Sequence, residues 1–345
     1  MNKIAIVILN WNGRQYLERF LPSVVMYSTY PHVEIVVIDN ASTDTSLEFL
    51  STTYPTITRV VLDKNYGFTG GYNKGVQHID ADYAVFLNSD VEVTANWLDK
   101  PIEHLHTHPN TVAVQPKILS FENRAMFEFA GASGGYIDFL GYPFCRGRII
   151  SEIEQDNGQY NKPIPIFWAS GACLFVRLQE FIQYGGFDDF FFAHMEEIDF
   201  CWRMKSKGRD VFCIPESVVY HVGGGTLTKE NPHKTYLNFR NNLLLIYKNM
   251  LPKQALLVFF IRFFLDYLAA IMMLLQGKPN DAKAVYRARK DFARHKKAFS
   301  AVRLLNMQEN VVAQHSEMYT GSILVDFYIR RKRRFSELSI ARLFQ

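Results

Sequence analysis

The 345-residue sequence has few cysteines, little net charge and no long apolar run at its N-terminus. Its four cysteines include no C-x-x-C pair, which argues against a zinc site and against a disulfide framework. The formal net charge of +4 is too small to indicate binding to nucleic acid. Residues 4–9 are too short an apolar run for a signal peptide, so we expect a cytosolic protein.

The turn after this first apolar run also lacks the glycines of a dinucleotide-binding site. A Rossmann fingerprint needs G-x-G-x-x-G there, and the residues present are Asn10-Trp11-Asn12-Gly13. Glycines at positions 67, 70 and 71 come later, without an acidic residue at the spacing that a ribose contact would need. We therefore do not expect an NAD-dependent enzyme.

Short apolar runs alternate with helical segments through the first hundred residues. The runs that have the pattern of buried strands are residues 4–9, 34–38, 60–62 and 83–87, and the helices are expected over 16–27 and 45–50. This alternation predicts a nucleotide-binding α/β fold with an open, mostly parallel sheet flanked by helices. With 48% hydrophobic residues, the chain can bury one sizeable core and a smaller appendage.

Polar residues follow two of these strands directly. Asp39 ends the second strand, and Asn88-Ser89-Asp90 end the fourth. Ligands of open α/β sheets bind beyond the carboxyl ends of the strands. Oxygen ligands such as those of Asn88 and Asp90 suit a divalent cation that carries phosphates. This pattern predicts a ligand crevice at the sheet edge, with simple capping of the loops as the alternative.

Three carboxylates stand close together among bulky apolar residues, at Glu196, Glu197 and Asp199. Burying them together is costly unless cations, hydrogen bonds or a substrate share the site. Crowding and desolvation would raise their pKa values toward the range in which one of them can act as a general base. The alternative is an ordinary helix N-terminus, in which a glutamate pairs with Arg203 or Arg209.

Several motifs, in this order along the chain, resemble glycosyltransferase family 2 and its rhamnosyltransferase-like branch. They are Asn12-Gly13, residues 36–44, Asn65-Tyr66-Gly67-Phe68, Leu87-Asn88-Ser89-Asp90, Ser170-Gly171-Ala172 and Gly185-Gly186-Phe187-Asp188. The resemblance implies a GT-A fold and an inverting transfer of a sugar from a nucleotide-diphospho-sugar, such as dTDP-rhamnose or a UDP-hexose. It also implies an acceptor hydroxyl on a glycan or lipid-linked oligosaccharide in cell-surface polysaccharide synthesis.

The resemblance implies roles for single residues on the donor side. Asp39 would hydrogen-bond the nucleoside, with capping of the following helix as its alternative role. Asp90 would bind Mg²⁺ or Mn²⁺ bridging the diphosphate, and Asn88 stands where the family has the first acid of its D-x-D element. His221 is a candidate second metal ligand, with a structural histidine as the alternative. The other residues of the nucleotide-sugar site would be Asn12, Asn65, Gly67, Asn73, Ser89, Ser170 and Gly171.

The family's general base is the second residue of a Glu-Asp pair, and Glu197 occupies that position. It would take the proton from the acceptor hydroxyl as that oxygen attacks the anomeric carbon opposite the leaving diphosphate. Glu196 and Asp199 would orient the acceptor or the base, with Arg203 fixing them. The glycine-rich and aromatic stretch 127–148 would shape the acceptor side or form an ordinary β-ribbon.

The chain changes character near its C-terminal end. Residues 255–275 are long and apolar enough to span a bilayer, but Arg262 and Asp266 lie near the centre, where each costs roughly 3 kcal/mol. A helix lying in the membrane interface accommodates both charges at lower cost. Basic residues within 283–297 and 330–334 favour attachment to an anionic cytoplasmic leaflet. A buried helix and a homodimer contact are the alternatives.

We therefore expect a catalytic domain over residues 1–250, with a nucleotide-binding half at 1–100 and an acceptor half at 101–250. A helical, apolar and basic extension would follow at 251–345, and the protein would be cytoplasmic and peripheral on the inner face of the cell membrane. Two other classes stay open: a nucleotidyltransferase or other nucleotide-sugar enzyme, and a non-catalytic scaffold with a transferase fold. A nucleotidyltransferase would carry a glycine-rich, basic phosphate loop after its first strand, which residues 10–14 do not resemble.

Overall fold

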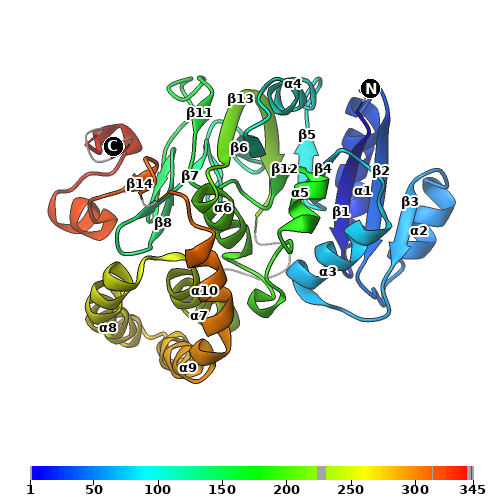
Figure 1. The fold of residues 1–345 in the computed structure, drawn as a ribbon. Helices are drawn as coiled ribbons and strands as arrows, with labels where there is room; N and C mark the ends of the chain where they lie inside the picture. Colours follow the sequence, from blue (N-terminus) through cyan, green and yellow to red (C-terminus); the bar gives the residue numbers. More distant parts are fainter. Residues whose placement is uncertain (1, 224–230, 313, 340–342, 344–345) are drawn as a thin grey trace.

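The computed structural model describes residues 2–223, 231–312, 314–339 and 343, and its centre is a nine-stranded sheet (Figure 1). Its strands, in the order in which they pair, are β11 (Ile164–Pro165), β13 (Asp210–His221), β6 (Thr111–Ser120), β12 (Cys173–Arg177), β4 (Tyr83–Asn88), β1 (Ile4–Asn10), β2 (Val33–Asp39) and β3 (Thr58–Val61). A ninth strand, β5 (Val91–Val93), pairs with β13.

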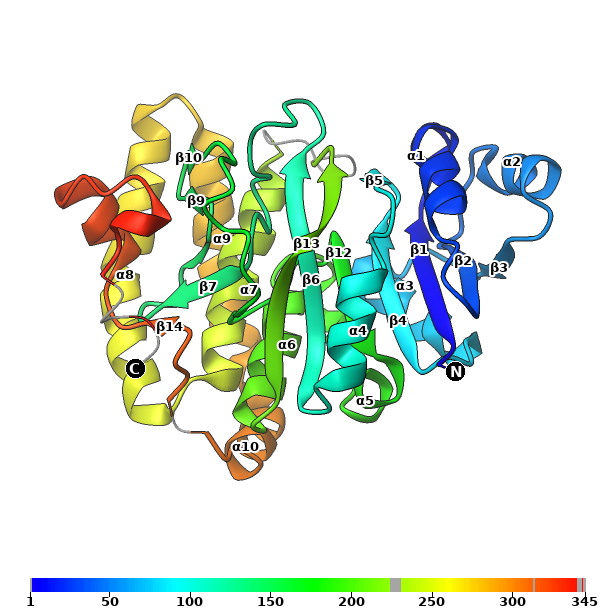
Figure 2. The same ribbon diagram turned by 90° about the horizontal axis from the view of Figure 1, so that it is seen from above.

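The block β3-β2-β1-β4 is parallel, as the alternation of strands and helices predicts. Asn10 of β1 is level with Asp39 of β2, and Leu9 is level with Asn88 of β4, so the carboxyl ends of these strands meet at one edge. Helices cover both faces of the block (Figure 2). They are α1 (Arg14–Tyr27), α2 (Ser46–Thr53) and α4 (Asp99–Thr107) on one face and α3 (Gly67–Gly75) and α5 (Leu178–Gln183) on the other.

The other half of the sheet is mixed. β12 runs antiparallel to β4 and β6, β13 runs parallel to β6, and β5 and β11 run antiparallel to β13. The α/β fold class is confirmed, but the sheet as a whole is less parallel than the first hundred residues suggest. The reason is the strand order: β12 inserts antiparallel between β4 and β6, neither of which is adjacent to it in the sequence, so the alternation of strands and helices no longer indicates parallel neighbours.

A second, five-stranded sheet lies beside the first. Its strands, in order, are β10 (Glu152–Ile153), β9 (Arg148–Ile149), β8 (Pro143–Cys145), β7 (Gly135–Asp138) and β14 (Met318–Tyr319). The stretch 127–148 therefore contributes a β-ribbon, and a strand near the C-terminal end completes it. Phe335 also packs against the rings of Tyr136 and Phe144. Part of the C-terminal segment thus packs directly on the β-ribbon, and the domain boundary near residue 250 stays a prediction.

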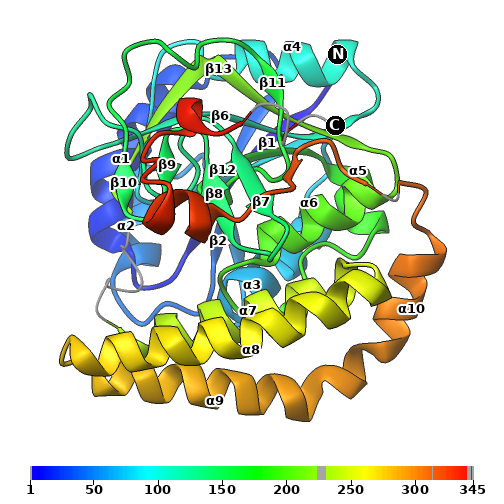
Figure 3. The same ribbon diagram turned by 90° about the vertical axis from the view of Figure 1, so that its left-hand side faces the viewer.

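Long helices form a layer on the far side of this second sheet (Figure 3). They are α7 (Pro232–Asn249), α8 (Pro252–Leu275) and α9 (Pro279–His295), followed by the shorter α10 (Ser300–Gln308). α8 turns Arg262 and Asp266 inward, where they form an ion pair at 3.0 Å, and Arg262 also donates to Asn242. Within the described residues, α8 is the one helix whose length and composition would allow it to cross a membrane.

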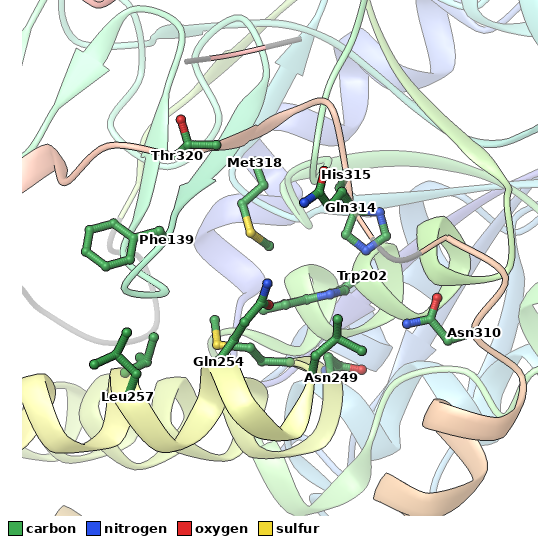
Figure 4. A pocket seen from close by; sticks show the side chains of 13 residues that line it. Phe139, Trp202, Asn249, Gln254, Leu257, Asn310, Gln314, His315, Met318 and Thr320 are labelled. Carbon is green, nitrogen blue, oxygen red and sulfur yellow. The ribbon is translucent and has the colours of Figure 1, made fainter. Parts of the chain in front are cut away.

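A pocket of about 260 Å³ lies between the start of α8, the β-ribbon and the C-terminal segment (Figure 4). Phe139, Trp202, Leu257 and Met318 supply much of its apolar lining, and Gln254 and His315 are among its polar members. None of the residues proposed from the sequence for the catalytic or donor site lines it. We therefore locate the candidate site elsewhere, at the carboxyl edge of the central sheet.

Candidate active site

The loops after β1 and β2 form one wall of the candidate site. Asn10 Nδ2 donates to Asp39 Oδ1 and to Ser42 Oγ, both at 3.1 Å, and Asp39 Oδ2 accepts from the Ser42 backbone N–H at 2.9 Å. Asn12 Oδ1 accepts from the Thr43 backbone N–H at 2.7 Å. The buried Asp39 thus holds the turn after β2 but does not cap the following helix, whose N-cap residue is Thr45. Asn10 was not anticipated, although its buried Oδ1 has no hydrogen-bond partner and is available to a ligand.

Asn40 joins this wall to the start of α3. Its Nδ2 donates to Asn65 Oδ1 at 3.0 Å and to the Gly67 carbonyl at 2.9 Å, and its Oδ1 accepts from the Tyr66 N–H. Gly67 has a φ of +72°, and a Cβ there would lie 2.4 Å from the ring of Phe192. Glycine is therefore required at this position on two counts. Asn40 is not among the site residues predicted from the sequence. Its position directly after a strand could have identified it as a candidate.

Asn73 does not face this wall. Its Nδ2 donates to the Phe187 carbonyl and to Asp189 Oδ1, both at 2.7 Å, and its Oδ1 accepts from the Phe187 N–H at 3.0 Å. Both polar atoms of the side chain are therefore engaged between α3 and the segment before the acidic cluster. The structure gives Asn73 a connecting role in place of the donor contact that the resemblance implied.

Asp90 and His221 meet where β4 and β13 end. The His221 Nε2 atom lies 3.2 Å from Asp90 Oδ1 and 3.4 Å from Asn88 Nδ2, and His221 Nδ1 lies 3.5 Å from Glu128 Oε1. Burial would lower the pKa of His221, but the carboxylates of Asp90 and Glu128 outweigh it and raise that pKa to about 10. Burial would likewise raise the pKa of Asp90, but the charge of His221 holds it below its usual range. Glu128 was not anticipated from the sequence.

This corner fits a divalent cation in part. Asp90 offers an oxygen ligand, and His221 offers a nitrogen ligand once a cation displaces the proton that its raised pKa favours, a donor set that suits Mn²⁺ or Mg²⁺. Within the described residues, no group of three or more His, Cys, Asp or Glu side chains could hold a metal by itself. The other ligands would therefore have to come from a bound diphosphate and water, as is usual for Mg²⁺.

Ser170 and Gly171 lie just before β12, at the same edge of the sheet. The Ser170 N–H donates to Gln115 Oε1 at 2.9 Å, and its hydroxyl donates to the Ala130 carbonyl at 2.5 Å. A Cβ at Gly171 would lie 3.3 Å from the ring of Phe68. Ser170 is buried with its hydroxyl engaged, so it shapes the wall of the site without offering a free hydroxyl to a ligand.

Glu196 and Glu197 begin α6 (Glu196–Ser206), and in each the Oε2 atom is buried without a hydrogen-bond partner. Burial raises the pKa of Glu197 to about 7. Burial and the neighbouring charge of Glu197 raise the pKa of Glu196 well above its ordinary value. The predicted alternative, a glutamate paired with Arg203 or Arg209, is not found for either carboxylate. Carboxylates whose pKa values are raised by desolvation, and in which one oxygen has no partner among the described residues, are candidates for a general base.

Asp199 lies one turn further along α6 and is fully paired. Its carboxylate accepts from Lys248 Nζ at 2.8 Å, from Asn249 Nδ2 at 2.8 Å and from Arg203 Nε at 3.0 Å. Burial would raise the pKa of Asp199, but Lys248 and Arg203 outweigh it and lower that pKa. Asp199 therefore anchors α6 to α7. This corrects the acceptor-orienting role implied by the resemblance, whereas its expected pairing with Arg203 is present.

The loops after β1 and β2 and the start of α3 form a wall that we call the donor wall. The segment before the acidic pair is connected to this wall through the backbone. The Phe192 carbonyl accepts from the N–H groups of Phe68 at 2.8 Å and Thr69 at 3.3 Å, both at the start of α3. Glu196 follows four residues after Phe192. The segment that leads into α6 thus packs against the start of α3, whereas the nucleotide and base roles of these residues stay predictions.

Comparisons with known proteins agree with this arrangement. The model of the family described as "Glycosyl transferase family 2" matches residues 5–176. The chain is 24% identical over 251 residues to the low-salt glycan biosynthesis hexosyltransferase Agl10 of Haloferax volcanii, covering 71% of this chain and 75% of that protein. It is 26% identical over 234 residues to the N-acetylglucosaminyl-diphospho-decaprenol L-rhamnosyltransferase of Mycobacterium tuberculosis, covering 63% and 75%.

Among solved structures, the chain resembles GalNAc-T7 crystallised with UDP, GalNAc and Mn²⁺. The TM-score is 0.58 at 15% sequence identity, and the similarity covers 88% of this chain and 57% of that chain. At this identity the similarity speaks for the fold alone. The nucleotide-sugar transferase fold that the sequence predicted is therefore confirmed.

Proposed function

Because this chain belongs to glycosyltransferase family 2, we propose that it transfers a sugar, with inversion, from a nucleotide-diphospho-sugar to an acceptor hydroxyl in cell-surface polysaccharide synthesis. The observation that carries this proposal is that Glu196 and Glu197 each hold a buried Oε2 atom without a hydrogen-bond partner among the described residues. The hexosyl and rhamnosyl transfers named for two relatives support a UDP-hexose or dTDP-rhamnose as donor. The decaprenol in one relative's name supports a lipid-linked acceptor.

Glu197 acts as the general base in this proposal. Its carboxylate takes the proton from the acceptor hydroxyl while that oxygen forms a bond to the anomeric carbon. The bond from that carbon to the diphosphate breaks on the opposite face, and the nucleoside diphosphate leaves. A pKa of about 7 suits this task, because the carboxylate is both largely ionised and appreciably basic slightly above neutral pH.

The donor lies along the wall of strand ends in this proposal. Asn12, Asp39 and Asn65 line the nucleoside side, and the diphosphate lies toward the Asn88–Asp90 corner. Asp90 and His221 would hold Mg²⁺ or Mn²⁺, which would neutralise the charge of the leaving diphosphate. The Mn²⁺ in the GalNAc-T7 structure supports a divalent cation without distinguishing between the two metals.

A thermal-shift screen of nucleotide-sugars, with and without Mn²⁺, tests the donor and the metal together. We expect one donor to raise the melting temperature of the full chain further when Mn²⁺ is present. Asp90→Ala should remove the metal-dependent part of that shift, because it removes the carboxylate ligand. Asp80→Ala is the matched control, since Asp80 is exposed and pairs with Lys3 on the surface. A shift that ignores Mn²⁺, or that survives Asp90→Ala, would contradict the metal assignment.

The outer face of α8 supports attachment to a membrane. Arg262 and Asp266 point into the protein, so the charges that would oppose membrane contact are removed from this face. The apolar side chains that remain exposed on α8 are Leu256, Leu257, Phe260, Phe263, Phe264, Leu268, Ile271, Met272, Leu274 and Leu275. A helix with such a face lies in the plane of the membrane interface. Exposed basic residues on α9, among them Lys283, Arg287 and Lys290, add attraction to anionic lipids.

Sedimentation with anionic vesicles tests this attachment on the full chain. Phe260→Ser with Phe264→Ser should release most of the protein into the supernatant, because both rings belong to the outer face of α8. Val25→Ser with Met26→Ser on α1 removes exposed apolar side chains of similar number and serves as the control. If the unaltered chain ignores the vesicles and sediments as a dimer, the α8 face is a contact between copies of the chain.

A further inference from the structure

Residues 190–195, which we call the strap, link the donor wall to the start of α6 and hold an unusual backbone conformation. Phe192, His194 and Met195 have φ values of 65°, 70° and 73°. Residues with a Cβ adopt this left-handed conformation only where their surroundings hold them in it. Since the last two of these residues directly precede Glu196, the strained turn sets the direction in which α6 begins.

Two neighbouring side chains of α7 support the strap. Arg240 Nη2 donates to the carbonyl oxygens of Phe190 at 2.9 Å and Phe191 at 3.2 Å, and Asn241 alone reaches the residues that directly precede α6. Asn241 of α7 donates from Nδ2 to the carbonyl oxygens of Phe191 at 3.0 Å, Ala193 at 2.8 Å and His194 at 2.8 Å. Its Oδ1 accepts from Arg240 Nε at 2.9 Å, which fixes the amide with its NH₂ group toward the strap. Asn241 is fully buried. Solvent does not reach this amide, so bulk water would not take over its hydrogen bonds to the strap if the side chain were removed.

The other side of the strap lies on the donor wall. The Phe192 carbonyl accepts from the Phe68 and Thr69 N–H groups, and the Phe192 ring covers Gly67 so closely that a Cβ there would overlap it. The strap is thus held between two helices. α3 belongs to the donor wall, whereas Asn241 of α7 contacts the strap and not the donor wall. Losing the α7 contacts would leave the donor wall in place and free the end of the strap that leads to the carboxylates.

We propose that Asn241 is a positioning residue, which holds the left-handed turn before α6 and thereby places Glu196 and Glu197 against the donor wall. The inference rests on the proposed function of these carboxylates. Displacement of a reacting group by about 1 Å can cost on the order of 10²-fold in rate. Removing Asn241 should therefore lower kcat, whereas KM for the donor should change little because the donor wall keeps its own hydrogen bonds.

The next residue of α7 provides a matched control. Asn242 is also buried, and its Nδ2 also donates to a backbone carbonyl, that of Gly141 at 2.6 Å, while its Oδ1 accepts from Arg262. It does not contact the strap. Asn241→Ala and Asn242→Ala therefore remove the same side chain from the same helix, and only the first removes the support of the turn.

The test compares kcat, donor KM and amide hydrogen exchange of these two variants in the full chain. For Asn241→Ala we expect kcat to fall by about 10- to 100-fold, donor KM to stay within about twofold and exchange to accelerate over residues 190–197. Asn242→Ala should lower the melting temperature and leave kcat and this exchange unchanged. Equal kcat losses in both variants, or unchanged exchange in Asn241→Ala, would overturn the proposal.

A second-site variant separates positioning from loss of folding. Glycine adopts a left-handed backbone without strain, so Met195→Gly in the Asn241→Ala background should restore kcat several-fold. Further loss of kcat in this double variant would count against the proposal. Should Asn241→Ala not fold, Asn241→Ser, which keeps one donor, replaces it in both comparisons. If the chain shows no transfer that depends on Glu197, the proposed function fails, and hydrogen exchange still tests the support of the strap.

Discussion

The first turns of α6 hold buried carboxylates in two opposite environments. Asp199 is surrounded by Lys248, Arg203 and Asn249, and its pKa is lowered even though burial alone would raise it. Glu196 and Glu197 lie three and two residues earlier, each with a buried oxygen that has no partner among the described residues, and their pKa values are raised by burial. This difference indicates that Asp199 stabilises the fold, whereas the unpartnered oxygens of Glu196 and Glu197 are left for hydrogen bonds to a substrate.

The contrast has energetic consequences of opposite sign. A carboxylate whose pKa is lowered by folding adds stability above its unfolded pKa, whereas one whose pKa is raised subtracts stability as the pH rises through the interval between the two values. The chain therefore bears a cost at Glu196 and Glu197 that Asp199 does not impose. Such a cost is typical of a site held ready for a reaction.

Glu197→Gln should produce the largest change on the catalytic side. The amide keeps the size of the side chain but cannot take up the acceptor proton, so turnover should fall by about 10²–10⁴-fold with donor affinity nearly unchanged. Stability should rise above pH 7, because the variant removes a carboxylate whose pKa folding raises. Steady-state kinetics and urea unfolding at pH 8 measure both effects. Turnover equal to that of the unaltered chain would assign the base elsewhere.

Asp199→Ala should produce the largest change on the structural side. Removal of one partner from a buried ion pair costs about 3–5 kcal/mol, because Lys248 and Arg203 are left without their counter-charge. The lowered pKa of Asp199 means that its contribution is present above the unfolded pKa of about 3.9 and is lost as the pH falls through the folded value. The two unfolding curves should therefore converge in acid. A large loss of turnover without loss of stability would return Asp199 to the acceptor site.

Glu196→Gln should lower turnover less than Glu197→Gln does. Glu197, and not Glu196, occupies the position of the family's general base. Removing the charge of Glu196 should therefore lower the rate by less than Glu197→Gln does. Because burial and the charge of Glu197 raise the pKa of Glu196, the variant should also gain stability at alkaline pH. The two rates are measured side by side under saturating substrates. The reverse order of rates would identify Glu196 as the base.

The sequence predicted the parallel half of the fold well, because buried strands and strand-end polar residues leave local patterns. The positions of Asp39 and Asp90 at one sheet edge follow from the sequence alone, since the carboxyl ends of parallel strands meet there. The mixed half was less accessible, because its pairings join segments far apart in the chain. β14, for example, pairs with β7 across about 180 residues.

The roles within the acidic cluster could not be separated from the sequence. In the sequence, nothing distinguishes the role of Asp199 from the roles of its glutamate neighbours. Its partners Lys248 and Asn249 lie about fifty residues later and come close only in the fold. Glu128 and Asn241 were missed for the same reason, since each acts on a residue that only the fold brings close. Local patterns indicated which residue types carry chemistry, whereas the partners that decide between structure and catalysis are non-local.

The pH dependence of sugar transfer at saturating donor and acceptor tests the central claim most directly. Glu197 must lose its proton to act as a base, so the rate should rise with pH and reach half of its maximum near pH 7. In Glu197→Gln the residual rate should lack this limb, because the side chain at position 197 no longer titrates. A limb near pH 4 to 5, or an unchanged limb in Glu197→Gln, would contradict the assignment of Glu197, with its desolvated carboxylate, as the catalytic base.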